Sequence, residues 1–185
     1  MVRQTTLETP ADVLNYALTL EHLEHAFYRD GLDEFTEDDF TEAGYAAEVY
    51  ENFGLIRDHE AEHVEVLVSV LESLDESPVE EGEYDFGYAD VAGFVAVAQA
   101  LENTGVGAYT GAAQFLIGEN ELLTAALTIH GVEARHASYL NGLNEVSPFP
   151  EAVDAPLTPD EVLAIATPFI VSAEAEGEAE ATPAA

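Results

Sequence analysis

Apolar residues recur at helical spacing along four long stretches of the chain. The first helix is predicted to begin at Pro10 and to run to about residue 32, because Thr9 is a capping residue and proline suits the first helical position. Further apolar stripes predict helices over residues 46–74, 91–117 and 121–143. No stretch is convincing as a strand, so the sequence predicts an all-α fold.

The connections between these helices predict the topology. Residues 33–42 are predicted to form an acidic loop, and residues 75–90, with one proline and two glycines, to form a connection. A helix of about 25 residues is about 38 Å long, whereas the second connection extends to about 50 Å. It can therefore cross the bundle, while the break at residues 118–120 joins only antiparallel neighbours. This is a four-helix bundle with one long crossover.

The composition divides the chain into three parts. Residues 1–146 are predicted to form the bundle. Residues 147–171 begin with closely spaced prolines and are predicted to form an arm on the bundle or on a neighbouring molecule, with a short helix over residues 159–166. Residues 172–185 are an acidic, low-complexity tail with too little apolar surface to order itself, so we expect it to be disordered.

The charge balance is strongly acidic, with 38 acidic residues against 4 basic ones and a formal net charge of -34. Such a chain repels itself at low ionic strength, and concentrated salt screens the repulsion. We interpret the charge as adaptation to a salt-rich cytoplasm of the haloarchaeal type. It argues against proteins that bind nucleic acid or anionic membranes through basic patches.

Two absences narrow the classes further. The chain has no cysteine, which excludes disulfides, thiolate metal sites and cysteine nucleophiles. Residues 1–15 lack an apolar secretory core, and no apolar run is long enough to span a bilayer. We therefore expect a cytoplasmic protein that does not enter membranes.

The two halves of the bundle repeat a pattern of polar residues within apolar stripes. In each half, one helix carries a glutamate after a leucine, with a tyrosine seven residues later, and the next helix carries Glu-x-x-His. Residues three apart share a helical face, so all of these side chains are predicted to point inwards. The candidate metal ligands are Glu21, Glu60, His63, Glu102, Glu133 and His136.

Four carboxylates in an apolar core need partners, because burying each charge costs several kcal/mol. Two divalent cations would neutralise them, with the histidines as neutral nitrogen ligands. This donor set without thiolate suits iron or manganese, and zinc is a further occupant of the same site. Chance Glu-x-x-His matches are common in so acidic a chain, so the placement carries the argument. The alternative is a protonated or hydrogen-bonded polar core without metal.

Other polar residues have weaker claims on the site. Tyr28 and Tyr109 are either hydrogen-bond donors or radical relays beside the metals, or ordinary core tyrosines. Glu24 and His25 either replace or support Glu21, and for Glu24 a solvated helix face is the other alternative. Surface or packing roles are predicted for His22, His59 and His130. Close approach of the first helix or of another subunit is predicted at Gly105, Gly107 and Gly111.

Five segments carry a resemblance to a known family: residues 20–28, 60–63, 101–103, 132–136 and the arm at 148–170. They resemble the ferritin-like superfamily, and within it the branch of stress- and desiccation-related ferritin-like proteins. The resemblance covers almost the whole chain except the tail. It implies a carboxylate-bridged di-iron or di-manganese centre, with Glu60 and Glu133 as bridging candidates and Glu21 and Glu102 as terminal ligands. Two features depart from the pattern: many members of the branch are exported and this chain shows no signal, and its third helix is rich in glycine.

Three functions are compatible with this reading. The first is an oxidoreductase that reduces dioxygen or peroxide, as a ferroxidase or a peroxide-removing enzyme in stress protection. The second is metal binding or storage without turnover, which needs a closed cage. The third is a metal-free structural protein that protects others during drying or salt stress. The expected partners are metal ions, dioxygen or peroxide, and further copies of the chain in a dimer or larger homo-oligomer. No catalytic residue is assigned.

Overall fold

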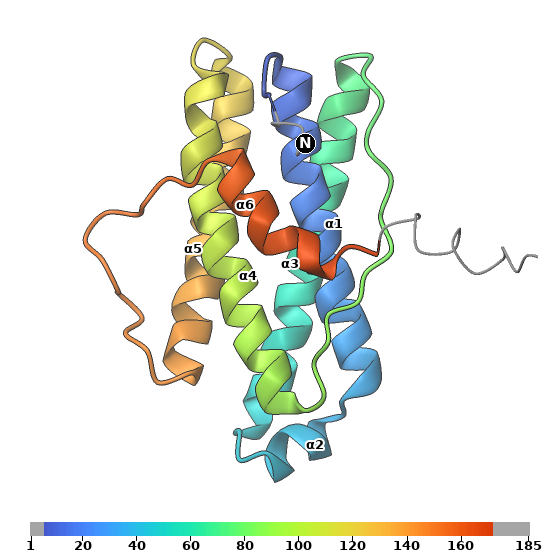
Figure 1. The fold of residues 1–185 in the computed structure, drawn as a ribbon, viewed down its shortest axis with the longest axis vertical. Helices are drawn as coiled ribbons and strands as arrows, with labels where there is room; N and C mark the ends of the chain where they lie inside the picture. Colours follow the sequence, from blue (N-terminus) through green and yellow to red (C-terminus); the bar gives the residue numbers. More distant parts are fainter. Residues whose placement is uncertain (1–5, 172–185) are drawn as a thin grey trace, which may run out of the picture.

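Four long helices form the body of the molecule in a computed structural model that describes residues 6–171 (Figure 1). Helix α1 packs mainly against α3, and α4 packs mainly against α5, while α1 and α4 also touch. No strand forms within the described range, so the predicted all-α four-helix bundle is confirmed. The long helices are α1 (Pro10–Glu34), α3 (Ala47–Ser73), α4 (Val91–Ala112) and α5 (Asn120–Leu143).

Helix α1 begins where the sequence predicts. The Thr9 side chain accepts a hydrogen bond from the backbone N–H of Asp12 at 3.1 Å, and the Asp12 carboxylate accepts one from the backbone N–H of Thr9 at 2.8 Å. This reciprocal capping box satisfies two backbone donors that the helix leaves unpaired. The start of α1 is therefore fixed locally, by residues within one turn.

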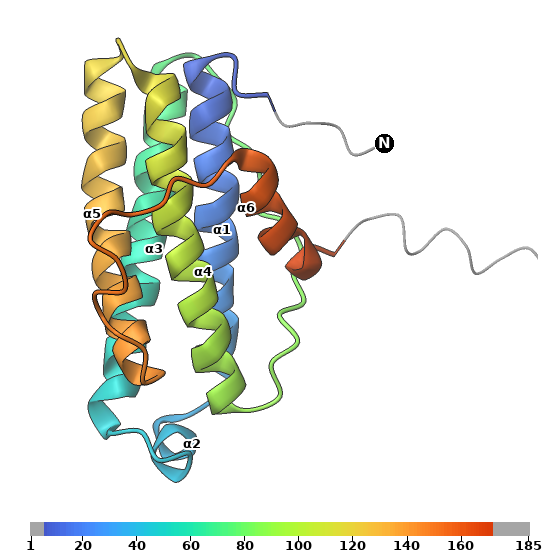
Figure 2. The same ribbon diagram turned by 60° about the vertical axis from the view of Figure 1, so that its left-hand side comes forward.

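The prediction of a loop over residues 33–42 is wrong, because a short helix, α2 (Glu37–Glu42), occupies most of that segment. A second capping box, between Thr36 and Asp39, starts it. Phe40 of α2 is fully buried, with its ring edge against Phe53 of α3 at a centroid distance of 5.4 Å. Burial of this aromatic ring holds α2 against the end of the bundle (Figure 2).

The connection between α3 and α4 runs along the length of the bundle, so these two helices are parallel (Figure 1). This is the predicted long crossover. Helix α1 fastens it at Val79: the backbone N–H donates to Asn15 Oδ1 at 2.7 Å, and the carbonyl oxygen lies 3.1 Å from His22 Nε2. His22 therefore has a packing role, as the sequence predicts.

The junction between α4 and α5 is longer than the predicted three-residue break. Helix α4 ends at Ala112 rather than near residue 117, and a turn of 3-10 helix, η1 (Ala113–Leu116), follows it. Gly118 then adopts a φ of +103°, a left-handed conformation that favours glycine. The chain reverses there and enters α5 at Asn120.

The segment after α5 crosses the outside of the bundle and ends in helix α6 (Pro159–Ala166) and the 3-10 turn η2 (Thr167–Phe169) (Figure 2). The predicted short helix is confirmed. Leu157 donates a backbone hydrogen bond to the Gly107 carbonyl at 3.0 Å, and a Cβ at Gly111 would collide with the Leu157 backbone. These two glycines of α4 therefore admit the arm, not helix α1 or another subunit as predicted. The predicted tail, 172–185, lies outside the described residues.

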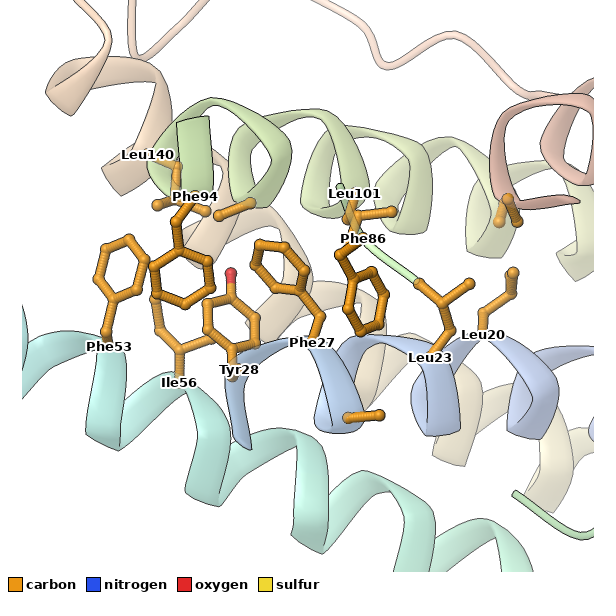
Figure 3. Packing of buried hydrophobic residues seen from close by; sticks show 14 of the residues in the cluster. Leu20, Leu23, Phe27, Tyr28, Phe53, Ile56, Phe86, Phe94, Leu101 and Leu140 are labelled. Carbon is orange, nitrogen blue, oxygen red and sulfur yellow. The ribbon is translucent and has the colours of Figure 1, made fainter. Parts of the chain in front are cut away.

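The largest apolar cluster contains a group of closely packed aromatic rings (Figure 3). Phe94 of α4 lies at its centre, with ring centroids 4.7 Å from Phe27 and 5.3 Å from Phe53. A smaller cluster joins Leu14 and Leu18 of α1 to other helices. Tyr28 belongs to the larger cluster and Tyr109 to the smaller one. The hydroxyl group of Tyr28 donates to the buried carboxylate of Glu102, and that of Tyr109 donates to Glu21.

Candidate metal centre

Six polar side chains from four helices are buried together inside the bundle. The four glutamates are 0% exposed, and the two histidines are 7% and 5% exposed. Each reaches the interior because it occupies a position on the apolar stripe of its helix, as its spacing in the sequence predicts. The residues are Glu21 from α1, Glu60 and His63 from α3, Glu102 from α4, and Glu133 and His136 from α5.

The six residues form two overlapping groups of four. Within each group, every residue offers one donor atom, and these atoms all lie within 4.8 Å of one another. Glu60 and Glu133 belong to both groups. Glu21 and His63 complete the first group, whereas Glu102 and His136 complete the second. The arrangement therefore has two positions for a cation, with two shared carboxylates and one terminal carboxylate on each side.

Three carboxylates converge on one ring nitrogen of His63. Its Nδ1 lies 2.9 Å from Glu60 Oε2, 3.1 Å from Glu21 Oε2 and 3.2 Å from Glu133 Oε1. In the other half, His136 Nδ1 lies 2.9 Å from Glu60 Oε1 and 3.2 Å from Glu102 Oε2. Both imidazoles thus direct Nδ1 at the carboxylates and the opposite edge of the ring away from them.

Two tyrosines hold the terminal carboxylates in a reciprocal arrangement. Tyr28 of α1 donates a 2.7 Å hydrogen bond to Glu102 Oε1 of α4, and Tyr109 of α4 donates a short hydrogen bond to Glu21 Oε1 of α1. In each carboxylate this leaves Oε2 directed at a histidine. Both tyrosines therefore touch candidate ligands, so they are not merely packing residues of the core.

The electrostatics of the cluster are those of charges crowded out of water. Burial, and then the charge of Glu102, raise the pKa of Glu60 to about 7, and burial raises the pKa of Glu133 well above its usual range. Burial alone would lower the pKa of His136, but hydrogen bonds to Glu102 and Glu60 outweigh it and raise the value to about 9. In the absence of a cation, protons are therefore held within the cluster.

Protons alone do not satisfy these groups, which is the test of whether cations fit. A single N–H at His63 Nδ1 faces three carboxylates at once, and it forms hydrogen bonds to Glu21 and Glu60 only. Both oxygens of Glu133 remain buried without a hydrogen-bond partner. A buried acceptor left unpaired is unfavourable, whereas carboxylate oxygens and imidazole nitrogens are ordinary ligands of divalent metals. The residues present therefore fit a two-metal centre.

Comparison with known proteins agrees with this geometry. A family described as the ferritin-like domain matches residues 9–145, which include all six residues of the cluster. The chain belongs to the ferritin-like family. It is also similar to Protein rds1 of Schizosaccharomyces pombe (strain 972 / ATCC 24843), at 26% identity over 167 residues. That match covers 89% of this chain and 40% of the relative, so the chain spans less than half of that protein's length.

Glu24 adds a fifth buried carboxylate to this ferritin-like core. It is 3% exposed, so the solvated helix face considered from the sequence is wrong. A Cβ built on Gly105 of α4 would lie 3.1 Å from Glu24 Oε1 and 2.9 Å from Glu133 Oε2. Burial, and then the charge of Glu133, raise the pKa of Glu24 well above its usual range. The absence of a side chain at Gly105 thus makes room for two carboxylates.

The remaining histidines separate into three situations. His25 is only half-buried. Burial, and then the charge of Arg29, lower the pKa of His25. The residue lies outside both groups of donor atoms. The proposal that it supports Glu21 has no contact in its favour. His130 lies 3.0 Å from the Thr110 hydroxyl, in agreement with a packing role.

His59 is exposed, in agreement with the predicted surface role, but it also contacts the centre, which sequence reasoning missed. Its Nδ1 lies 3.0 Å from Nε2 of His136, on the ring edge that faces away from the carboxylates. The signal available in the sequence was its place four residues before His63, which puts both on one side of α3. Nothing in the sequence alone indicates that α5 brings His136 to the same place.

The helices give no sign of a membrane span. None of those formed within residues 6–171 combines the length and the apolar character needed to cross a bilayer.

Proposed function

We propose that this ferritin-like protein binds two divalent iron or manganese ions through Glu21, Glu60, His63, Glu102, Glu133 and His136 and uses them in redox chemistry with dioxygen or peroxide. Glu60 and Glu133 bridge the two positions, and Glu21 and Glu102 are terminal ligands. Ferroxidase activity and peroxide removal are the two forms of this chemistry that the site supports. The proposal extends to a role in stress protection, as in the stress- and desiccation-related branch that the sequence resembles.

One observation supports the proposal above all others: neither oxygen of the fully buried Glu133 accepts a hydrogen bond, although Oε1 lies 3.2 Å from His63 Nδ1 and the residue shares the site with two histidines and three other carboxylates. A metal-free polar core would leave these oxygens unpaired in a place that water does not reach. Two divalent ions would give every one of these oxygens a ligand role. When bound, two iron or manganese ions supply the electrons that reduce dioxygen or peroxide.

The chain's own residues define how such a centre is held. Tyr28 and Tyr109 orient the terminal carboxylates through hydrogen bonds. Glu60 and Glu133 are completely buried and so are fixed by the packing of α3 and α5. The two apolar clusters, which contain Tyr28 and Tyr109, exclude water from the site. The exclusion of water strengthens the charge interactions within it.

Metal analysis and rapid mixing test the proposal. Protein purified without chelator is expected to contain two iron or manganese ions per chain, and stopped-flow mixing of the ferrous protein with oxygen, then with peroxide, should show fast oxidation. Glu60→Ala and Glu133→Ala should abolish it. Glu65→Ala is the matched control, because Glu65 lies exposed on the same helix as Glu60. Unchanged oxidation rates in the two site variants would eliminate an oxidoreductase role for this centre.

The acidic composition supports a salt-rich cytoplasm as the working environment. The net charge of -34 produces repulsion that reaches about 10 Å at 0.1 M salt but only about 3 Å at 1 M. The free energy of unfolding should therefore rise with KCl concentration. Urea unfolding measured across that range tests the point, and a stability that falls with KCl would contradict it.

We also propose that the chain forms a homo-oligomer, a dimer or larger. Exposed apolar side chains support this: Leu55 on α3 is 56% exposed and Leu127 on α5 is 55% exposed. Burying such side chains between subunits is favourable. Native mass spectrometry distinguishes a dimer from a closed cage, and only a cage would be compatible with mineral storage.

A further inference from the structure

The two halves of the centre are not supported equally. His136 has both ring nitrogens engaged: Nδ1 faces Glu60 and Glu102, and Nε2 lies 3.0 Å from His59 Nδ1. Among the described residues, His63 forms hydrogen bonds through Nδ1 only. One histidine of the pair therefore has a partner behind it, and the other has none.

The contact between His59 and His136 has defined geometry. The two rings meet edge to edge and are nearly coplanar, with centroids 5.3 Å apart, planes 10° from parallel and the facing nitrogens 3.0 Å apart. His136 offers a lone pair to a cation from Nδ1 only if its proton resides on Nε2. The N–H at Nε2 then donates to His59 Nδ1, which must be the unprotonated nitrogen of that ring. Either nitrogen can donate across this 3.0 Å contact, but when a cation occupies Nδ1 of His136 only Nε2 can donate, so an unprotonated His59 Nδ1 stabilises the metal-binding tautomer.

The internal repeat shows what replaces this contact in the other half. His59 directly precedes Glu60, and the residue directly preceding Glu133 is Val132. Valine has no hydrogen-bonding group, so it cannot support His63 in the same way. Val132, His59 and His63 all line one cleft of about 340 Å³ on the surface of the bundle. His63 and the exposed His59 thus border the same space, but only His136 has a hydrogen-bonding ring, that of His59, behind it.

We infer that His59 is a positioning residue, which fixes the tautomer and orientation of His136 and makes the second metal position tighter than the first. This inference rests on the proposed two-metal function. Outer partners of metal-bound histidines typically change metal affinity by about 10- to 100-fold. Two unequal positions are therefore expected, with the weaker one on the His63 side, next to the cleft.

Two substitutions separate the hydrogen bond from the packing. His59→Phe keeps an aromatic ring of similar bulk but removes the acceptor, whereas His59→Asn provides an amide oxygen near the place of Nδ1. Val132→Phe is the matched control, because it adds bulk to the same cleft at the equivalent position of the other half. The probe is Zn²⁺, which is diamagnetic and suits the same ligands.

Titration calorimetry with Zn²⁺ and nitrogen-15 NMR of labelled histidines measure the effect. Wild type should bind two ions with unequal affinities and show a slowly exchanging Nε2 proton on His136. His59→Phe should lose about 10- to 100-fold in affinity at the tighter position and lose that protected proton. His59→Asn should restore both, and Val132→Phe should change neither.

The outcomes separate the two claims. A wild-type protein that binds no Zn²⁺ and contains no metal overturns the proposed function and the inference with it. A wild-type protein that binds two ions, with His59→Phe matching it in both affinity and proton protection, overturns only the role of His59. Equal losses in His59→Phe and Val132→Phe would show an effect of bulk in the cleft and would also overturn it.

Discussion

The two halves of the bundle, α1 with α3 and α4 with α5, present the same chemistry to a shared centre. Both provide two glutamates, one histidine and one tyrosine, at matching places on their helices. The tyrosines exchange partners, since Tyr28 donates to Glu102 and Tyr109 donates to Glu21 of the other half. The common residues are therefore those that form the two proposed cation positions.

Two of the differences between the halves bear directly on the centre. Glu24, three residues after Glu21, corresponds to Gly105, three residues after Glu102. The difference is steric. The Glu24 carboxylate of α1 lies beside Gly105 of α4, in space that a side chain at that position would occupy. His59 and Val132 form the second unequal pair. What the sequence repeats defines the centre, and what it does not repeat makes the two sides of the centre unequal.

The largest effect should come from breaking the shared residues rather than the terminal ones. Glu60→Ala or Glu133→Ala removes a ligand from both positions and should lower the affinity for both ions by more than about 100-fold, the upper effect of losing only an outer partner. Glu21→Ala and Glu102→Ala should each weaken one position and leave one ion bound. Metal stoichiometry from elemental analysis distinguishes the two patterns. Loss of both ions in Glu21→Ala would contradict the assignment of bridging and terminal roles.

A smaller effect is expected where the halves are sterically unequal. Gly105→Ala would place a Cβ 2.9 Å from Glu133 Oε2, which forces buried atoms apart and should lower the free energy of unfolding by about 1–3 kcal/mol. Gly131→Ala is the control, because its Cβ would meet nothing within 4 Å, and alanine there should be neutral or stabilising. Urea unfolding of both variants checks this. Equal stabilities would show that Gly105 is not needed for space.

The reciprocal tyrosines should give matched effects. Tyr28→Phe and Tyr109→Phe each remove a hydrogen bond to a buried carboxylate, which typically contributes about 1.5–3 kcal/mol. The two variants should therefore lose similar stability in chemical unfolding of the metal-free protein. A large difference between them would show that the two terminal glutamates are held differently.

The mildest test is the pH dependence of the metal-free protein. The folded-state pKa of Glu60, about 7, and that of His136, about 9, both lie above their ordinary values of 4.5 and 6.5. Groups that bind protons more tightly when folded stabilise the protein at low pH and lose that contribution as pH rises through these values. Stability should therefore fall between about pH 4.5 and pH 9 without metal. Metal-loaded protein, whose site protons are displaced, is the control and should show a weaker dependence.

Much of the fold was predictable because its signals are local. The starts of α1 and α6 depend on capping residues within one turn, and the long crossover follows from the length of one connection. The same kind of signal was present at α2, where Thr36 and Asp39 form a capping box in a segment taken for a loop. The acidic composition of that segment predicts a loop, whereas its capping residues start a helix.

The sequence by itself determined which side chains would face inwards, because helical periodicity and the apolar stripes decide that for each helix separately. Only the tertiary structure decided what those side chains meet. Glu24 is buried because Gly105 leaves space for it. His59 contacts the centre because α5 brings His136 beside it. Contacts of this kind join residues far apart in the chain, and their geometry depends on how the helices pack, which no local pattern encodes.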